Sequence, residues 1–307
     1  MSFTSQVKDE LTRVDPGCSH CDRATLAALA RIEGTLLLSG QGKYGLEIAT
    51  EISSAARLVV RCLHSIYSLE TEVTVRRNVL HKSLNYLIAV PDQKGLQAAL
   101  EDLGILGGLG IEMGIDQRLV QKTCCRAAYL RGAFLGSGFI ADPKGDFHFE
   151  ITVEGERLAE DLVALMEEFG VGAHVTRRRN SYIVYMKGGT AICEFLALTG
   201  AHQCALAMEN ERVLKSVRSD INRQVNFEMA NQEKTTAAAM DQIASIRKIV
   251  ESGRLSQLPP GLQEFIRLRC TYPEATLKEL GEKAKPPLSK SAVYHRVRRL
   301  EEIARNL

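Results

Sequence analysis

An internal repeat limits what this chain can fold into more than any other feature of the sequence. The segment RIEGTLLLSGQ at 31–41 is similar to YLRGAFLGSGF at 129–139, and placing Gly34 on Gly132 gives an offset of 132 − 34 = 98 residues. An ordered series of matches at a nearly constant offset indicates a duplicated structural unit. The further matches, in order, are LEI at 46–48 with FEI at 149–151, and VTVRRN at 73–78 with VTRRRN at 175–180.

Both copies predict the same elements in the same order. Segments with apolar residues at helical spacing are followed by segments in which apolar and polar residues alternate, as they do in strands. The order is helix, strand pair, helix, strand pair, helix, so we expect an α+β fold of the type αββαββα in each copy. The predicted first helices are 22–39 and 121–137, the second helices run from 55 to 66 and from 158 to 169, and the strands include 46–52, 72–78, 84–90, 147–153, 174–180 and 182–186.

The first helix of each copy carries small residues at matching positions, Ala30 with Ala128 and Gly34 with Gly132. A duplicated chain buries the apolar faces of its sheets most simply by pseudo-twofold packing. Small residues let two helix backbones approach closely, so we expect these two helices to meet at the pseudo-twofold axis. The alternative is that the glycines are tolerated in exposed helices at a cost of about 1 kcal/mol each.

The composition is that of a globular protein without a strong overall charge. The 307 residues are 45% hydrophobic and 25% charged, and the net charge is +2, so a nucleic-acid-binding surface would have to concentrate basic residues locally. The N-terminal segment MSFTSQVKDELTRV lacks the basic and apolar stretches of a secretory signal, and no apolar run is long enough to cross a bilayer. We therefore expect a cytoplasmic protein without a membrane partner.

The eight cysteines are scattered along the sequence. In a cytosolic chain this distribution indicates reduced, mostly buried thiols. Only Cys18-Ser19-His20-Cys21 has the spacing of metal ligands. A zinc site normally needs a second such pair, and because none follows nearby in the sequence, we expect no metal ion.

The C-terminal part of the sequence predicts a separate all-α domain. The segment 201–257 is helix-rich and polar, and Pro259-Pro260-Gly261 marks a domain boundary. Three helical patterns follow at 262–270, 276–284 and 289–304, and a short turn separates the last two. This arrangement predicts a helix-turn-helix domain. The predicted domains are a duplicated domain at 1–200 with repeats at about 20–103 and 119–200, a helical linker at 201–257, and the helix-turn-helix domain at 258–307.

The second and third of these helices predict both a small core and a DNA-binding face. Thr276 can cap the second helix with Glu279 three residues later, and a serine at the start of the third helix lies where backbone amides favour phosphate. The core residues are expected to be Leu277, Leu280, Ala284, Val293, Val297 and Leu300. The predicted DNA-binding residues are Thr276, Ser289, Lys290, Ser291, Tyr294, His295, Arg296, Arg298 and Arg299. The alternative is a helical protein-docking domain with a solvated basic face.

The repeated segment YLRGAFLGSG resembles the motif helix of LAGLIDADG homing endonucleases, and the duplicated order of elements resembles their single-chain form. In that family the second aspartate of each motif binds the divalent metal that promotes DNA cleavage. The matching residues here are Ser39 and Ser137, and a serine hydroxyl is a weak ligand for a hard cation. We therefore expect no catalytic residues, no cofactor and no enzymatic activity. The alternative is a residual metal-dependent endonuclease that uses Glu47 or Glu150, although both lie on alternating strands.

Basic residues recur on the third strand of each copy. Guanidinium groups spaced along a concave sheet suit contacts to phosphates and base edges, so DNA binding by the sheets is a second prediction. The alternative is that these charges only solvate the outer face. The residues concerned are Arg76, Arg77, Arg177, Arg178 and Arg179.

Over essentially the whole chain, the sequence resembles the WhiA family of bacterial regulators, in which a degenerate LAGLIDADG-like domain precedes a helix-turn-helix. The similar segments are SFTSQVKDEL, the two motif helices, INRQVNFEMANQEKT, and LPPGLQEFIRLR followed by SKSAVYHRVRRLEEIA. The resemblance implies a nucleoid-associated regulator of transcription that binds promoter DNA in sporulation, cell division and chromosome segregation. It also implies a protein partner, either an RNA polymerase sigma factor or a WhiB-type iron–sulfur protein. The alternative is that the duplicated domain is a protein-interaction scaffold and only the helix-turn-helix binds DNA.

Overall fold

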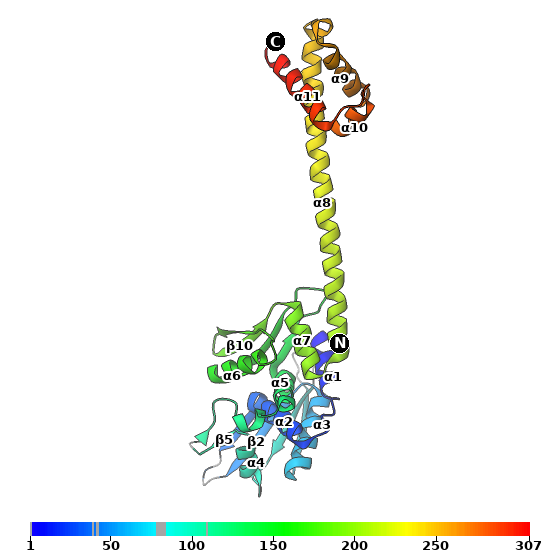
Figure 1. The fold of residues 1–307 in the computed structure, drawn as a ribbon. Coiled ribbons are helices and arrows are strands. Elements are labelled where there is room, and N and C mark those ends of the chain that lie inside the picture. The colour runs from blue at the N-terminus through cyan, green and yellow to red at the C-terminus, as the bar shows by residue number, and fades with distance from the viewer. Residues whose placement is uncertain (1, 39, 41–42, 78–83, 109) are drawn as a thin grey trace. The chain divides into compact units, whose positions relative to one another are not determined.

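The computed structural model describes residues 2–38, 40, 43–77, 84–108 and 110–307. The chain divides into two compact units, Met1–Lys215 and Ser216–Leu307, and each unit has its own hydrophobic core. The continuous helix α8 (His202–Glu251) contributes residues to both cores. The predicted polar linker is therefore a single helix over most of its length (Figure 1).

The first unit contains two α+β copies with the predicted order αββαββα. The first copy consists of α2 (Ser19–Glu33), β1 (Gly34–Leu38), β2 (Tyr44–Thr50), α3 (Ser53–Tyr67), β3 (Glu72–Arg77), β4 (Leu84–Val90) and α4 (Leu96–Asp102). The second consists of α5 (Thr123–Ser137), β7 (Gly138–Ile140), β8 (Phe149–Val153), α6 (Glu156–Glu167), β9 (His174–Arg178), β10 (Ser181–Met186) and α7 (Gly189–Thr199). Outside the copies lie α1 (Phe3–Leu11), β5 (Leu106–Gly107), β6 (Gly110–Ile111) and the short 3-10 helix η1 (Gln117–Val120).

Each copy builds one antiparallel sheet, with strand order β1-β2-β4-β3 in the first and β7-β8-β10-β9 in the second. Alternation along each central strand places one set of side chains in the core, for example Leu46 and Ile48 on β2 and Phe149 and Ile151 on β8. The rings of Phe134, Phe149 and Phe195 pack with centroid separations from 4.6 to 5.8 Å. The α+β fold class predicted from periodicity is confirmed.

Helices α2 and α5 pack against each other through small residues, as predicted (Figure 1), although Gly34, one of the residues predicted at this contact, lies in β1 instead. A Cβ atom added to Gly132 would lie 2.3 Å from the carbonyl oxygen of Thr25 and 2.9 Å from Cβ of Ala28. The Thr25 hydroxyl donates to the carbonyl oxygens of Cys21 and Ala128 at 3.0 and 3.1 Å. No larger residue fits at Gly132 unless these two backbones move apart.

The structure changes the alignment of the two motif helices. Gly34 begins β1 opposite Ile48, and Gly138 begins β7 opposite Ile151, so the offset is 138 − 34 = 104 residues rather than 98. The prediction that the first helix extends to residue 39 is wrong, because α2 ends at Glu33 and Gly34–Leu38 form an edge strand. The run GTLLL has neither helical nor strand periodicity, which is why the boundary was not visible in the sequence.

The second unit is all-α, and its helices agree with the predicted segments. The terminal part of α8 packs with α9 (Pro260–Thr271), α10 (Leu277–Lys283) and α11 (Lys290–Arg305), while the short 3-10 helix η2 (Leu255–Gln257) connects α8 to α9. The predicted packing of α10 on α11 is confirmed, and Thr276 forms the predicted capping box with Glu279. The fully buried or nearly buried side chains of this core include Ile246, Ile249, Leu262, Phe265, Leu280, Val293, Val297 and Leu300.

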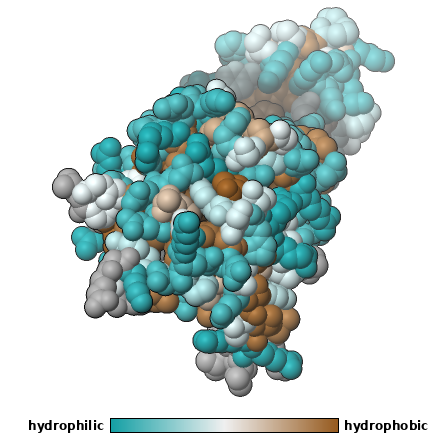
Figure 2. Space-filling view, turned by 90° about the horizontal axis from the view of Figure 1, so that it is seen from below, coloured by the Kyte–Doolittle hydropathy of each residue, from teal (hydrophilic) through white to brown (hydrophobic). Residues whose placement is uncertain are grey.

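The surface of the first unit that faces the viewer in Figure 2 is mainly hydrophilic, with apolar residues in small groups. Among the described residues, no helix combines the length and apolarity that a membrane span requires.

Candidate nucleic-acid interface

Helix α11 has one apolar face and one basic face. Val293, Val297 and Leu300 are at most 4% exposed and pack into the core of the second unit. The side chains between them point away from that core, because residues three or four apart share one face of a helix. Of the predicted DNA-binding residues in this region, the exposed ones are Ser289, Lys290, Ser291, Tyr294, His295, Arg298 and Arg299.

The start of α11 is formed by two serines. The Ser289 hydroxyl accepts a hydrogen bond from the backbone N–H of Ala292 at 3.3 Å, and it lies 3.2 Å from the Ser291 hydroxyl. Both serines and the following Lys290 are exposed. An exposed helix N-terminus with hydroxyls and an ammonium group is suited to bind a phosphate of the DNA backbone.

Arg296 differs from the other predicted residues of α11 because it forms an ion pair within the second unit. Its guanidinium Nη1 lies 2.9 Å from the carboxylate of Glu264 on α9, and both side chains are about three-quarters buried. The backbone N–H of Lys285 and the Arg296 guanidinium hold the pKa of Glu264 below its usual range. Arg296 therefore positions α11 against α9, while Arg298 and Arg299 remain exposed.

Thr276 lies at the N-terminus of α10 and is exposed, and its hydroxyl oxygen caps the helix. It accepts a hydrogen bond from the backbone N–H of Glu279 at 3.3 Å, and the Glu279 carboxylate accepts one from the backbone N–H of Thr276 at 2.7 Å. The residue shapes the turn before α10, and its O–H can still donate to a phosphate oxygen while the oxygen accepts the capping hydrogen bond.

The predicted arginines of the two sheets lie on exposed edge strands. Arg76 is opposite Asn85 and Arg178 is opposite Ser181, which places both arginines on the faces turned away from the helices. Arg77 and Arg177 have the opposite alternation, and Arg177 lies over the ring of Tyr182 with 5.9 Å between its Cζ and the ring centroid. Arg179 follows β9 with a φ of 57°. The structure therefore brings only Arg76 and Arg178 to equivalent outward positions.

The outward faces of the two sheets are not strongly basic. They also carry Glu47 opposite Thr35, Glu72 opposite Ala89, and Glu150 opposite Phe139. Glu47 and Glu72 flank Ala89, four residues along β4 from the partner of Arg76, and Glu150 is opposite Tyr185, four residues along β10 from the partner of Arg178. Among the described outward strand positions, three carboxylates thus stand against two arginines, whereas a surface that binds DNA by its phosphates needs a clear positive excess.

The LAGLIDADG-like helix ends do not carry the two residues that the sequence alignment predicted. Ser39 lies outside the described residues, and the alignment of Gly34 with Gly138 places Glu33, rather than Ser39, at the position equivalent to Ser137. Sequence reasoning missed Glu33 because the serine-glycine pairs were aligned instead of the glycines that start the strands. One copy thus has a carboxylate and the other a hydroxyl.

Neither helix end is arranged as a site for a hard cation. The Ser137 hydroxyl donates to the carbonyl oxygen of Thr152 at 2.5 Å. The Lys8 ammonium donates to the carbonyl oxygen of Gly136 at 2.6 Å, and burial raises the pKa of Glu33 while Lys8 opposes the shift. The carboxylates of Glu33 and Glu51 thus share their surroundings with the Lys8 ammonium, whose positive charge disfavours a bound Mg²⁺.

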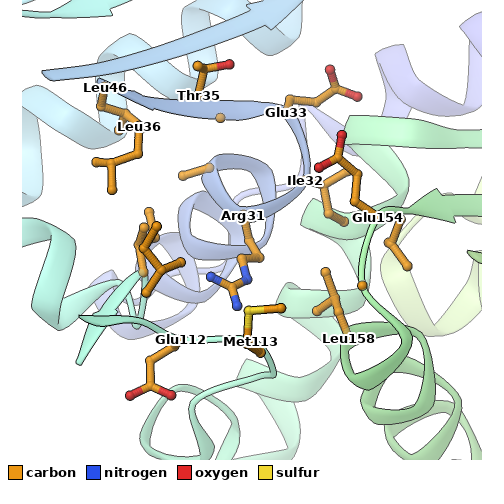
Figure 3. Close-up of a pocket in the computed structure, with 16 residues that line it drawn as sticks. Arg31, Ile32, Glu33, Thr35, Leu36, Leu46, Glu112, Met113, Glu154 and Leu158 are labelled. Atoms are coloured by element: carbon orange, nitrogen blue, oxygen red, sulfur yellow. The ribbon is translucent and has the colours of Figure 1, made fainter. Parts of the chain in front are cut away.

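Glu33 also lines a cavity (Figure 3). Segments of both copies and the 105–113 region line it, and its charged members are Arg31, Glu33, Glu112 and Glu154. Three carboxylates against one guanidinium make this cavity unsuitable for a phosphate group.

The two units together define a class of protein. Two four-stranded antiparallel sheets around a central helix pair are LAGLIDADG-like, and the second unit is a helix-turn-helix domain. Residues 19–106 match the WhiA N-terminal LAGLIDADG-like domain, 126–218 match the WhiA LAGLIDADG-like domain, and 221–304 match the WhiA C-terminal HTH domain.

Relatives of similar length confirm this class and show the family. A protein of Desulforamulus reducens is 42% identical over 310 residues, covering 100% of this chain and 96% of the relative. One of Thermoanaerobacter pseudethanolicus is 43% identical over 312 residues, covering 100% and 98%. Each bears the name "Probable cell division protein WhiA". The crystal structure of full-length DUF199/WhiA from Thermatoga maritima has the same fold, with a TM-score of 0.60 at 23% identity over 100% of this chain and 99% of that one. The chain belongs to the WhiA family.

Proposed function

We propose that this chain is a non-enzymatic regulator of transcription that binds double-stranded DNA sequence-specifically through α11. The observation that carries the proposal is the exposed surface of α11, which begins with Ser289, Lys290 and Ser291 and continues along the helix with His295, Arg298 and Arg299. A helix of this kind, held by a short turn after a capped helix, fits the major groove of DNA. The names of the relatives support a role in cell division, and we extend the proposal to promoters of genes for cell division, chromosome segregation and sporulation.

For the duplicated domain we propose contact with protein rather than with DNA. The carboxylates on its outward sheet faces offset the charge of Arg76 and Arg178, so these faces favour a partner of mixed charge. An RNA polymerase sigma factor or a WhiB-type protein is the proposed partner, and the nucleoid in the cytoplasm is the proposed location.

The absence of cleavage is part of the same proposal. The pairing of Glu33 with Ser137 gives the two halves unequal ligands, and the Lys8 ammonium lies at the end of α5. Glu150, a candidate substitute ligand, is held by His148 with 2.6 Å between Nε2 and Oε1. Purified protein should therefore leave supercoiled plasmid intact in magnesium or manganese. Nicking that is lost in Glu33→Gln, Glu47→Ala or Glu150→Ala would support an endonuclease instead.

A salt titration of DNA binding tests the central claim. Genomic fragments enriched by repeated binding to the full chain supply the specific duplex, and a shuffled duplex supplies the comparison. In Arg298→Ala with Arg299→Ala, we expect specific affinity to fall by about 100-fold and the slope of log K against log salt to decrease by about 2. Equal affinity of this variant and the unaltered chain for the specific duplex would overturn the proposal.

Two further double variants serve as a control for the loss of charge and as a test of DNA contact by the sheets. Arg13→Ala with Arg157→Ala removes the same charge from exposed side chains paired with Asp9 and Asp161, and should leave binding unchanged. Arg76→Ala with Arg178→Ala should also leave the slope unchanged. A shallower slope of log K against log salt in that second variant would show that the sheets contact phosphates. It would contradict the proposal that the duplicated domain contacts protein rather than DNA.

A further inference from the structure

Five sulfur and nitrogen donors meet where α2 and α5 begin, at the opposite end of these helices from Glu33 and Ser137. The ligand atoms of Cys18, His20, Cys21 and Cys124 all lie within 4.8 Å of one another. His20 Nδ1 is 3.6 Å from Cys18 Sγ and 3.4 Å from Cys21 Sγ. The thiol of Cys125 adjoins the group, with 3.2 Å between its Sγ and His20 Nδ1.

The pseudo-twofold arrangement of the helix pair explains why these residues meet. With the structural offset of 104 residues, His20 corresponds to Cys124 (124 − 20 = 104) and Cys21 corresponds to Cys125 (125 − 21 = 104). Each copy therefore contributes a pair of adjacent donors on the first turn of its first helix. Close packing of α2 on α5 brings the two pairs together, and Cys18 adds a further sulfur. The further ligand that the Cys18–Cys21 segment lacks is therefore supplied by the other copy, by Cys124, about 100 residues away in the sequence.

The separations of these atoms suit tetrahedral coordination. With Zn–S near 2.3 Å and Zn–N near 2.0 Å, adjacent ligand atoms of a tetrahedral site are about 3.5 Å apart. The distances of His20 Nδ1 to the sulfurs of Cys18 and Cys21 are close to this value. A hydrogen bond to a thiol explains one such contact, whereas four ligand atoms that all lie within 4.8 Å of one another match the spacing of a single coordination shell.

We propose that Cys18, His20, Cys21 and Cys124 bind one zinc ion that joins the two copies of the duplicated domain. Three thiolates and an imidazole are ligands that zinc prefers, and a complete set of four leaves no open position for substrate, so the site is structural. The N-termini of α2 and α5 carry partial positive charge that offsets the excess charge of three thiolates. This inference is independent of the proposed DNA binding, since it concerns only the first unit.

Metal analysis of the full chain tests the proposal. Protein purified with a phosphine reductant and no added chelator should contain about one zinc per chain. After exchange into cobalt, tetrahedral thiolate coordination should give visible d–d bands and a sulfur-to-cobalt charge-transfer band in the near ultraviolet. Less than about 0.2 zinc per chain together with no cobalt bands would overturn the proposal, and so would an iron chromophore in place of zinc.

Variants assign the ligands. Cys124→Ser changes an exposed residue and is the variant with the least risk to folding; we expect loss of the charge-transfer intensity of one sulfur and at least a 10-fold weaker competition against a chromophoric chelator. Cys18→Ser should behave in the same way. Cys193→Ser and Cys270→Ser are matched controls outside the cluster and should bind as the unaltered chain does. Unchanged cobalt spectra in both Cys18→Ser and Cys124→Ser would show that these residues are not ligands.

Discussion

Lys8 carries an ammonium group in a buried environment, which disfavours its positive charge. Its side chain is buried, and Nζ donates to the carbonyl oxygen of Gly136 at the end of α5. Burial lowers the pKa of Lys8 to about 8, and the carboxylates of Glu33 and Glu51 partly oppose the shift. This helix end thus carries a partly buried cluster of one ammonium group and two carboxylates. An endonuclease of the LAGLIDADG type has a pair of aspartates at the equivalent helix ends.

This environment predicts a dependence of stability on pH. The unfolded chain keeps Lys8 protonated up to its ordinary pKa of 10.5, whereas the folded chain releases the proton near pH 8. The free energy of unfolding should therefore rise between pH 8 and 10.5, by at most about 3 kcal/mol from this residue. Below pH 8 the lysine is protonated in both states and its contribution is constant.

Chemical denaturation of the full chain and of Lys8→Met at a series of pH values checks this prediction. The difference between the two is the useful quantity, because cysteines and tyrosines titrate over the same range. The unfolding free energy of Lys8→Met relative to the unaltered chain should fall as the pH rises from 8 to 10.5. A constant difference would contradict the prediction, and Lys94→Met, at an exposed position, should show no such trend.

The elements of the fold were predictable where the periodicity was clear, and were missed where it was not. Alternation in LEIATEI and FHFEITV identified β2 and β8, whereas the uniformly apolar TLLL hid β1 and misaligned the motif helices. The missed alignment concealed Glu33 and the correspondence of Cys21 with Cys125. These relations depend on how α2 packs against α5, and no local pattern in either segment contains that information.

The crossing of α2 and α5 predicts a large effect for a small substitution. In Gly132→Ala the new methyl group would meet the Thr25 carbonyl oxygen at 2.3 Å. The cost of moving two backbones should exceed the gain of about 1 kcal/mol in helix propensity, so we expect a net loss of at least about 2 kcal/mol. Thermal and denaturant unfolding measure it. Gly172→Ala is the control, because an added Cβ there has no neighbour within 4 Å; equal stabilities of the two variants would contradict the crossing.

In the second unit, Arg269 connects three elements from inside the core. It is 1% exposed; its Nε donates to Gln242 Oε1 at 2.9 Å, and Nη1 donates to the carbonyl oxygens of Pro273 and Ala275. Arg269→Leu would leave the buried Gln242 Oε1 without its donor and break two part-buried hydrogen bonds, and we expect the second unit to lose about 2 kcal/mol or more. Arg267→Leu changes an exposed residue of the same helix. If Arg269→Leu and Arg267→Leu have the same free energy of unfolding in urea, the hydrogen bonds of Arg269 do not stabilise the second unit.

The whole molecule has two hydrophobic cores that share one helix. Helix α8 gives Cys204 and Met208 to the core of the first unit and Ile246 and Ile249 to that of the second. From residue 209 to residue 238, α8 has no buried side chain. A helix stretch without tertiary packing transmits little cooperativity, because most helical stability in proteins comes from packing of one face. The HTH match beginning at 221 and the unit boundary at 215 both fall in this stretch.

Calorimetry of the full chain should therefore show two unfolding transitions. A strong zinc chelator should lower the temperature of one transition by several degrees, because zinc binds only the folded first unit, and Gly132→Ala should lower that same transition. Arg269→Leu should lower the other one and leave the first where it was. A single transition that moves with all three changes would show that α8 couples the cores into one cooperative structure, and zinc bound in the first unit would then stabilise the second unit as well.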